Sequence, residues 1–364
     1  MTLYTMADVA DVSIELATED DKHLPAYDHT YLSNICMCPT WGIIRYGQNK
    51  AMSEGGRAMA LEAGSAAHEF FAAVRLLEVL DQGHTEHFDY HGKRIFGDGR
   101  WVAMRDFLEL ESVSLSKDTT DRLNFCLTAL HTSGFYDDPR DKKRTLSSIE
   151  ESCIAYFDKW PWGKRPVWIR NTEDPTTDIG VECAVHLVIT YTLNDGTEFR
   201  LRYTGRADGL HHRSKTDSAL VVHENKTGAR IDKTWLDGMK MTHQITGYTA
   251  WATVFSGVPC DRAVVHGMVI PLPKSFDFGG ILDEPIRRHE HHFHSWLEWI
   301  LFGYQIDRQY IHNPLAAPKF THSCTRYFRS CSFMPLCNSP REEQPDILHE
   351  MVIDEWDPLA ESKA

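Results

Sequence analysis

The chain of 364 residues lacks any apolar run that approaches the roughly 18 residues a membrane-spanning helix requires. Residues 1–25 are acidic and lack the basic stretch and apolar core of a secretion signal. The sequence also lacks internal repeats and low-complexity tracts, which argues against a repeat protein or a disordered chain. We therefore expect a soluble protein of the cytoplasm that neither enters a membrane nor is secreted.

An excess of positive charge is also missing, since 38 Lys and Arg against 52 Asp and Glu give a formal net charge of −14. Neutralisation of phosphates by cationic side chains supplies most nonspecific nucleic-acid binding, so this charge argues against a protein that coats nucleic acid. Cationic residues nevertheless concentrate in one segment: Arg200, Arg202, Arg206, Arg213, Lys215, Lys226, Arg230, Lys233 and Lys240. This concentration predicts a local basic groove, where an aromatic residue such as Trp235 could stack on bases or pack against the core.

The segment from Glu198 to Gly228 contains two adjacent strand-like runs joined by a polar turn, which predicts a hairpin. The first run, from Glu198 to Tyr203, leads to Gly205 and then Asp208, and the second run ends in Glu224 and Lys226. Side chains alternate along a strand, so Glu224 and Lys226 share one face while Asn225 points to the other. Two carboxylates and one ammonium group can therefore converge at one end of the hairpin.

Such a trio has a chemical use, because carboxylate oxygens suit Mg²⁺ or Mn²⁺, which keeps waters that a phosphate can displace. Asp208 and Glu224 would hold the ion, and Lys226 would orient or deprotonate the attacking water. The pattern thus predicts phosphodiester hydrolysis. In the alternative interpretation, Asp208 caps a turn while Glu224 and Lys226 form a cross-strand or solvent-facing pair of little energetic value.

Four separated motifs carry a wider resemblance: GSAAHEFF from Gly64, GRAD from Gly205, ENKTG from Glu224 and QITGY from Gln244. In order and rough spacing they resemble the RecB-like clade of the PD-(D/E)XK nuclease superfamily over most of the chain. The resemblance implies an α/β fold: a restriction-endonuclease-like core, with a mixed central sheet flanked by helices, a helical insertion and a terminal region held by an iron-sulfur cluster. The implied segments are 1–74 with the early cysteine and His motif, 75–165 as the insertion, 166–275 as the nuclease core and 276–364 as the C-terminal helix and cysteine-rich region.

The resemblance also implies a role for each matching residue. The metal ligands would be His68, Asp208, Glu224 and the carbonyl of Asn225; Lys226 would be the catalytic lysine, and Gln244 and Tyr248 would shape the site from a helix. Gln244 and Tyr248 are four residues apart and so share a helix face, but ordinary helix packing also explains them. His68 could equally be a satisfied core histidine on a helix with an apolar face.

The remaining elements follow from hydrophobic periodicity and turn signals. We expect helices at 61–80, 99–115, 118–133, 146–157, 234–255 and 284–304, and strands at 181–192, 198–206, 219–226 and 262–271. Asn194, Asp195 and Gly196 form a strong hairpin-turn signal.

Nine cysteines in such a chain indicate a metal site plus buried thiols more naturally than a disulfide framework. Three lie near the end as Cys324-x6-Cys331-x5-Cys337, with no fourth cysteine after them. Structural zinc sites usually show tighter paired spacings, although four cysteines also hold zinc. The other cysteines, Cys126, Cys153, Cys183 and Cys260, lie among apolar neighbours and are expected in the core.

The cysteine pattern is similar to that of RecB-like nucleases with an iron-sulfur cluster, including AddB-type and CRISPR-associated exonucleases. In those proteins one early cysteine joins three late ones, and the early cysteine commonly precedes a proline. The resemblance therefore implies a [4Fe-4S] cluster on Cys38, Cys324, Cys331 and Cys337, with zinc as the alternative metal and Cys36 as the alternative early ligand. Its role would be structural, joining the two ends of the chain.

The resemblance as a whole implies a Mg²⁺- or Mn²⁺-dependent deoxyribonuclease, favoured as an exonuclease acting on single-stranded DNA or DNA ends. Recombination, repair or phage DNA metabolism would be its setting, in the host cytoplasm if the chain is phage-encoded. A helicase, a recombination protein or a second copy of the chain would be its protein partner. Two alternatives remain: a catalytically silent DNA-binding or adaptor protein with the same fold, and an iron-sulfur redox or sensor protein.

Overall fold

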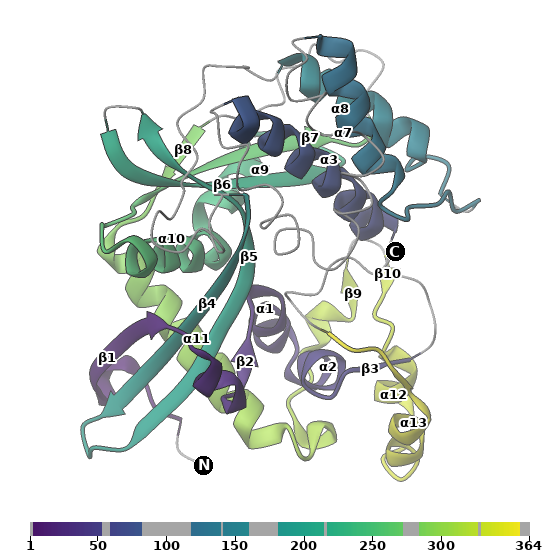
Figure 1. The fold of residues 1–364 in the computed structure, drawn as a ribbon. Coiled ribbons are helices and arrows are strands. Elements are labelled where there is room, and N and C mark those ends of the chain that lie inside the picture. The colour runs from purple at the N-terminus through teal and green to yellow at the C-terminus, as the bar shows by residue number, and fades with distance from the viewer. Residues whose placement is uncertain are drawn as a thin grey trace. The chain divides into compact units, whose positions relative to one another are not determined.

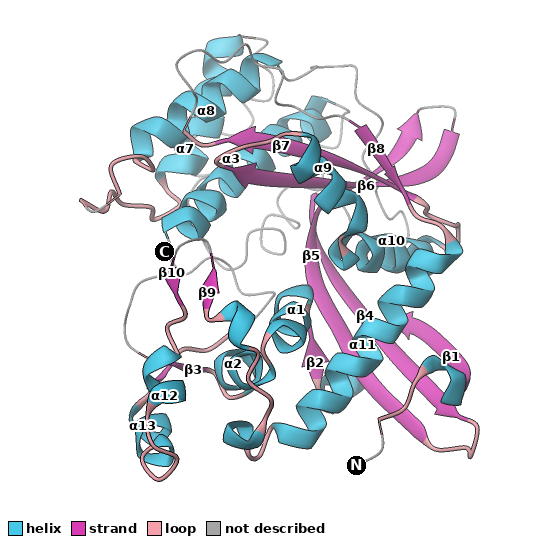
Figure 2. Cartoon of the chain, turned by 180° about the vertical axis from the view of Figure 1, so that it is seen from behind, coloured by secondary structure: helices cyan, strands magenta, loops and turns pink. Residues whose placement is uncertain are grey.

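The chain folds as an α/β protein with a mixed central sheet flanked by helices (Figures 1 and 2). The computed structural model describes residues 3–52, 59–81, 118–139, 141–159, 181–214, 217–271, 284–326 and 329–356. Two compact units divide the chain: unit 1 is Met1–Gly56, His186–Gly205 and Glu290–Ala360, and unit 2 is Arg57–Val185, Arg206–His289 and Glu361–Ala364. Among the described residues, no helix combines the length and apolar character needed to cross a membrane.

The central sheet has the strand order β1-β4-β5-β6-β7-β8, and β2 pairs with β5 beside this path. Its strands are β1 Val9–Leu16, β2 Ala26–Tyr27, β4 Val181–Leu193, β5 Glu198–Ser214, β6 Asp217–Gly228, β7 Arg262–Val269 and β8 Glu284–Arg287. β6 pairs with β7 in parallel, whereas β5 with β6 and β7 with β8 are antiparallel. These strands confirm the predicted ones, and the expected turn at 194–196 connects β4 and β5.

Unit 1 holds both ends of the described chain. Its other elements are α1 His29–Met37, α2 Pro39–Gly42, β3 Lys50–Ala51, α11 Glu290–Tyr310, β9 Thr325–Arg326, β10 Arg329–Ser330, α12 Met334–Asn338, α13 Gln344–Glu350 and β11 Val352–Ile353. β11 pairs with β3, and the Arg45 guanidinium lies 2.6 Å from the Asp354 carboxylate. The hydroxyls of Tyr27 and Tyr31 both donate to the buried Asp307 carboxylate, which fastens α1 to α11. Protein contacts therefore join the two ends of the described chain.

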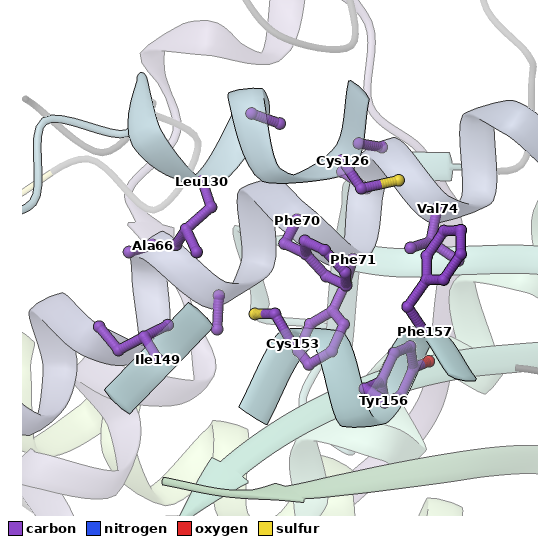
Figure 3. Close-up of a cluster of buried hydrophobic side chains, with 14 of the residues drawn as sticks. Ala66, Phe70, Phe71, Val74, Cys126, Leu130, Ile149, Cys153, Tyr156 and Phe157 are labelled. Atoms are coloured by element: carbon purple, nitrogen blue, oxygen red, sulfur yellow. The ribbon is translucent and has the colours of Figure 1, made fainter. Parts of the chain in front are cut away.

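In unit 2, three helices pack together over β6 and β7: α3 Met59–Asp81, α7 Thr119–His131 and α8 Leu146–Lys159 (Figure 1). Their apolar faces form one core cluster, in which Phe70 and Phe71 of α3 meet Cys153 and Tyr156 of α8 (Figure 3). These helices confirm the expectations for 61–80, 118–133 and 146–157, while the helix expected at 99–115 lies outside the described residues. Burial of this cluster fixes α3 against the sheet and so positions the residues on it.

The helix α3 begins at Met59, two residues before the expected start at 61, so Gly64 lies within it. Gly64 permits a close approach, because a Cβ there would lie 3.0 Å from the Thr227 hydroxyl oxygen of β6. Lack of a side chain thus lets α3 lie directly on the sheet.

The single helix expected at 234–255 is wrong: two helices, α9 Lys233–Met241 and α10 His243–Ser256, meet at Thr242. The Thr242 side chain accepts from the Gln244 N–H and so caps the start of α10. The buried Arg288 donates to the carbonyls of Lys240 and Thr242, which satisfies the carbonyls at the end of α9.

The helix expected at 284–304 is wrong at its beginning, because Glu284–Arg287 forms strand β8 and α11 starts at Glu290. Pro285 pairs with Val264, and the Arg288 N–H donates to the Asp261 carbonyl. Pairing with the edge of β7 therefore overrides the helical pattern here.

Candidate functional site

Two buried acids from neighbouring strands form the centre of the candidate site. Gly209 of β5 lies opposite His223 of β6, so the antiparallel register places Asp208 opposite Glu224. Asp208 is 5% exposed and Glu224 is 1% exposed. The structure thus brings together the two carboxylates that the sequence pairs.

His68 and Asn225 both contact Asp208. The His68 Nδ1 atom, on α3, lies 3.2 Å from Asp208 Oδ1, and the other oxygen, Oδ2, accepts from the backbone N–H of Asn225. His68 is neither a core histidine nor fully exposed, since its side chain is 31% accessible. One carboxylate therefore connects three elements: α3, β5 and β6.

Lys226 lies on the same side of β6 as Glu224, and its ammonium group donates to Glu224 Oε1. Among the described residues, the other oxygen, Glu224 Oε2, has no hydrogen-bond partner although it is fully buried. A buried carboxylate oxygen without a partner is costly, which marks the position as one that suits an additional cation or donor.

The charges of these groups act on one another. Burial, then the Asp208 carboxylate, raises the pKa of Glu224 to about 7, against the opposing effect of Lys226. Burial would also raise the pKa of Asp208, but His68, Lys226 and the Asn225 N–H together lower it. Burial alone would lower the pKa of Lys226, yet the carboxylates of Glu224 and Asp208 raise it. The site therefore holds a protonated lysine and two acids of different strength.

The donor set fits a hard divalent cation. Two carboxylates, one imidazole and a nearby backbone carbonyl are ligands that Mg²⁺ and Mn²⁺ accept, and the orphaned Glu224 Oε2 supplies a free lone pair. Among the described residues, no group of three or more His, Cys, Asp or Glu side chains is already spaced to hold an ion.

Gln244 and Tyr248 lie on one face of α10, as their spacing predicts, and Gln244 Nε2 donates to the Tyr248 hydroxyl over 3.0 Å. α10 packs against β6 and β7, and Tyr248 is buried. The contact between them is consistent both with a role in shaping the site and with ordinary helix packing.

Trp235 packs beside the Lys226 face of the sheet. Gly267 pairs with Lys226, and a Cβ on Gly267 would lie 3.1 Å from Trp235 Cη2 and 2.6 Å from Ile231 Cδ1. Of the two interpretations of Trp235, packing against the protein is the one these contacts describe.

Several of the cationic residues that predict a basic groove already have acceptors within the chain. In unit 1, Arg200 lies 3.2 Å from Asp21 and Arg202 donates to the Leu24 carbonyl. In unit 2, exposed ion pairs of this kind are Arg230 with Asp232 and Lys240 with Asp237, at 2.5 and 3.3 Å. Exposed pairs are weak, so a phosphate could replace these acceptors. Lys215 lies outside the described residues.

Sequence reasoning missed a polar layer on the opposite face of β6. His223 and Asn225 point there, and both contact the buried Arg75 of α3, as does the Tyr156 hydroxyl. Tyr156 in turn lies 3.1 Å from His266 Nδ1 of β7. The available signal was a single charged residue, Arg75, seven positions after His68 in an apolar stretch of the helix.

Cysteines form the second candidate site, in unit 1. Burial raises the pKa of Cys331, and the thiols of Cys38 and Cys324 raise it further. The pKa of Cys337 is raised by burial and by the other three thiols, with Lys319 opposing. These mutual effects require nearby sulfur atoms, and a cluster of electronegative thiols suits a thiolate-binding metal group.

The early cysteines have different surroundings. Cys38 ends α1 and precedes Pro39, the first residue of α2, whereas Cys36 interacts with Trp299 of α11, and burial raises its pKa to about 11. Cys331 also packs against a small core of Ile44, Phe333, Leu336 and Met351. Of the two early cysteines, Cys38, the preferred ligand, is therefore the one whose thiol acts on the pKa values of Cys331 and Cys337.

The four remaining cysteines are not all core residues. Cys126, Cys153 and Cys260 are buried as expected. Cys183 is only partly buried, because it lies near the start of β4, and the expectation of a core position is wrong for it.

Neither a model of a known protein family nor a curated protein sequence matches this chain.

Proposed function

We propose that the chain is a Mg²⁺- or Mn²⁺-dependent DNA nuclease of the PD-(D/E)XK type with a restriction-endonuclease-like core. One observation carries the proposal: the buried Asp208 and Glu224 carboxylates lie opposite each other, with Glu224 Oε2 lacking a partner among the described residues. His68 and Lys226 complete the set at these acids. Four side chains from three elements, α3, β5 and β6, form one ionic group, which neither a turn cap nor a surface ion pair requires.

Each residue has a chemical task in phosphodiester hydrolysis. His68, Asp208, Glu224 and the Asn225 carbonyl would hold the divalent ion. When bound, such an ion lowers the pKa of a coordinated water and neutralises the charge that develops on the phosphate. The attack of the water oxygen on phosphorus breaks the bond to the leaving oxygen, which takes up a proton.

Lys226 has a defined protonation state in this arrangement. Its raised pKa keeps it an ammonium at neutral pH, so it donates hydrogen bonds and bears positive charge. It is therefore suited to orient the attacking water and the scissile phosphate. Removal of the water's proton by Lys226 would first require its pKa to fall.

The substrate and setting follow from the resemblance of the motifs. We propose an exonuclease acting on single-stranded DNA or DNA ends in recombination, repair or phage DNA metabolism. A helicase, a recombination protein or a second copy of the chain would be its partner.

We also propose that Cys38, Cys324, Cys331 and Cys337 bind a [4Fe-4S] cluster with a structural role. The support is the mutual effect of these four thiols on the pKa values of Cys331 and Cys337. Zinc is the alternative occupant, and metal analysis of protein prepared without oxygen distinguishes iron with sulfide from zinc.

Nuclease assays with Mn²⁺ on labelled single-stranded, duplex, nicked and circular DNA test the function. Asp208→Ala and Lys226→Ala should each lose roughly 10²–10⁴-fold in rate, whereas Lys22→Ala, an exposed lysine of unit 1 paired with Glu19, is the control. Resistance of circles would establish a need for ends. Cleavage by both site variants at the parent rate would refute the proposal, and DNA binding without cleavage by the parent would indicate the silent adaptor.

A further inference from the structure

Arg75 is a cationic side chain held inside the apolar part of unit 2. It lies on α3, and none of it is exposed to solvent. Its Nη2 atom lies 2.7 Å from Asn225 Oδ1, 2.6 Å from His223 Nε2 and 2.8 Å from the Tyr156 hydroxyl. A guanidinium only donates, and Nη2 carries two hydrogens, so the three acceptors share these hydrogens and His223 must have an unprotonated Nε2.

Burial of a guanidinium is expensive, and a well-packed apolar side chain usually fills such a space with no loss of stability. The hydrogen bonds of Arg75 Nη2 are therefore informative. They reach two residues of one strand, His223 and Asn225, which share a face of β6. Arg75 thus binds the back of the strand whose front carries Glu224 and Lys226.

Asn225 connects its buried hydrogen bond with Arg75 to the candidate metal site. Its side chain accepts from Arg75, while its backbone N–H donates to Asp208. A shift of β6 at Asn225 would therefore change the hydrogen bond to Asp208 and would also displace the adjacent Glu224.

The helix provides a second connection. Arg75 follows His68 by seven residues, two helical turns, so both lie on one side of α3. His68 contacts β5 through Asp208, and Arg75 contacts β6 through Asn225. These two contacts hold α3 to the sheet at His68 and again, two turns later, at Arg75.

We propose that Arg75 is a positioning residue, which fixes β6 against α3 and thereby keeps His68 beside Asp208 and Glu224 for cation binding. The inference rests on the proposed metal site. Partners of this kind, one step removed from the ligands, typically account for 10–100-fold in metal affinity.

Mn²⁺ binding to the protein without DNA, followed by electron paramagnetic resonance, tests the inference independently of catalysis. Arg75→Met should weaken Mn²⁺ binding by 10–100-fold. Arg75→Lys should recover only part of this loss, because one ammonium cannot replace the planar array of donors. The matched control is Leu130→Ala on α7, which destabilises the same core cluster without changing a candidate ligand. At a temperature where Arg75→Met and Leu130→Ala are both folded, Leu130→Ala should bind Mn²⁺ like the parent.

A second variant covers the case in which Arg75→Met does not fold. Asn225→Ala keeps the backbone N–H and carbonyl but removes one of the three acceptors of Arg75. It should also weaken Mn²⁺ binding, and in a soluble double variant the two losses should not add fully, because both changes remove the bond between Arg75 and Asn225.

Parent-like Mn²⁺ affinity in Arg75→Met, or in Asn225→Ala where only that variant folds, would overturn the role of Arg75 while leaving the metal site standing. An equal loss in Leu130→Ala would also overturn it, since the effect would then be general destabilisation. Asp208→Asn separates the two proposals: a parent that binds no Mn²⁺, or binds it equally well with Asp208→Asn, refutes the metal site itself.

Discussion

Replacing Glu224 with glutamine should stabilise the metal-free protein at neutral pH while abolishing its affinity for a divalent cation. Glutamine has nearly the same shape, and its amide oxygen can still accept from Lys226. The change removes a buried negative charge that faces Asp208. A rise of the Glu224 pKa from 4.5 to about 7 corresponds to about 3 kcal/mol of lost stability once the carboxylate is ionised.

The direction of the Glu224 pKa shift determines the pH range over which the stability changes. The folded protein binds the Glu224 proton more tightly than the unfolded chain does, so this residue's contribution is complete below about pH 4.5 and is lost as the pH rises to about 7. The pKa of Asp208 is lowered and that of Lys226 is raised, so these neighbours act outside that window, below pH 3.8 and above pH 10.5. Groups that titrate there without interacting with Glu224 cancel when the variant is compared with the parent.

Urea unfolding with EDTA, at steps from pH 4.5 to pH 8, measures this difference. The advantage of Glu224→Gln in free energy of unfolding should grow by about 3 kcal/mol across the range and then level off. Excess Mn²⁺ should reverse the order, because a cation at 1,000 times its Kd adds about 4.1 kcal/mol to the parent alone. A difference independent of pH would refute the reasoning that Glu224 is buried with an unfavourable charge.

Two further predictions concern the approach of α3 and the early cysteine. Gly64→Val should lower the free energy of unfolding by about 1–3 kcal/mol in thermal or urea unfolding, because the valine side chain meets Thr227. The control is Gly238→Val, which should not lower it in this way, because no described atom lies within 4 Å of a Cβ there. Equal effects of the two changes would contradict the close approach of α3 to β6. Cys38→Ser should remove the iron and the visible absorption of protein prepared without oxygen, whereas Cys36→Ser should retain both; the reverse result would make Cys36 the ligand.

The local part of the fold could be predicted from the sequence. Alternation along β6 placed Glu224 and Lys226 on one face, and apolar periodicity gave α3, α7 and α8. The same alternation put Asn225 on the opposite face, where the structure has its side chain. These features depend on neighbouring residues only, so a single sequence is sufficient to specify them.

Features that depend on distant partners could not be predicted. The break between α9 and α10 is stabilised by Arg288, which lies 46 residues beyond Thr242 and donates to its carbonyl. Strand β8 exists because it pairs with β7, although its sequence continues a helical pattern. The importance of Arg75 also depends on a partner 150 residues away, Asn225, so only the charge of Arg75 in an apolar stretch signalled it.

The features that would let the candidate site bind a cation also destabilise the metal-free protein. This cost distinguishes a metal site from a structural ion pair. A structural pair would satisfy both oxygens of each buried acid, as the two tyrosines do for Asp307 in unit 1. Among the described residues, Glu224 instead keeps one buried oxygen without a partner, so the folded protein bears a cost that a divalent cation would remove. All of the proposed nuclease residues lie in unit 2 and all of the proposed cluster ligands in unit 1. Cluster loss in Cys38→Ser with unchanged Mn²⁺ affinity would therefore leave the nuclease proposal intact, and the two proposals can be refuted separately.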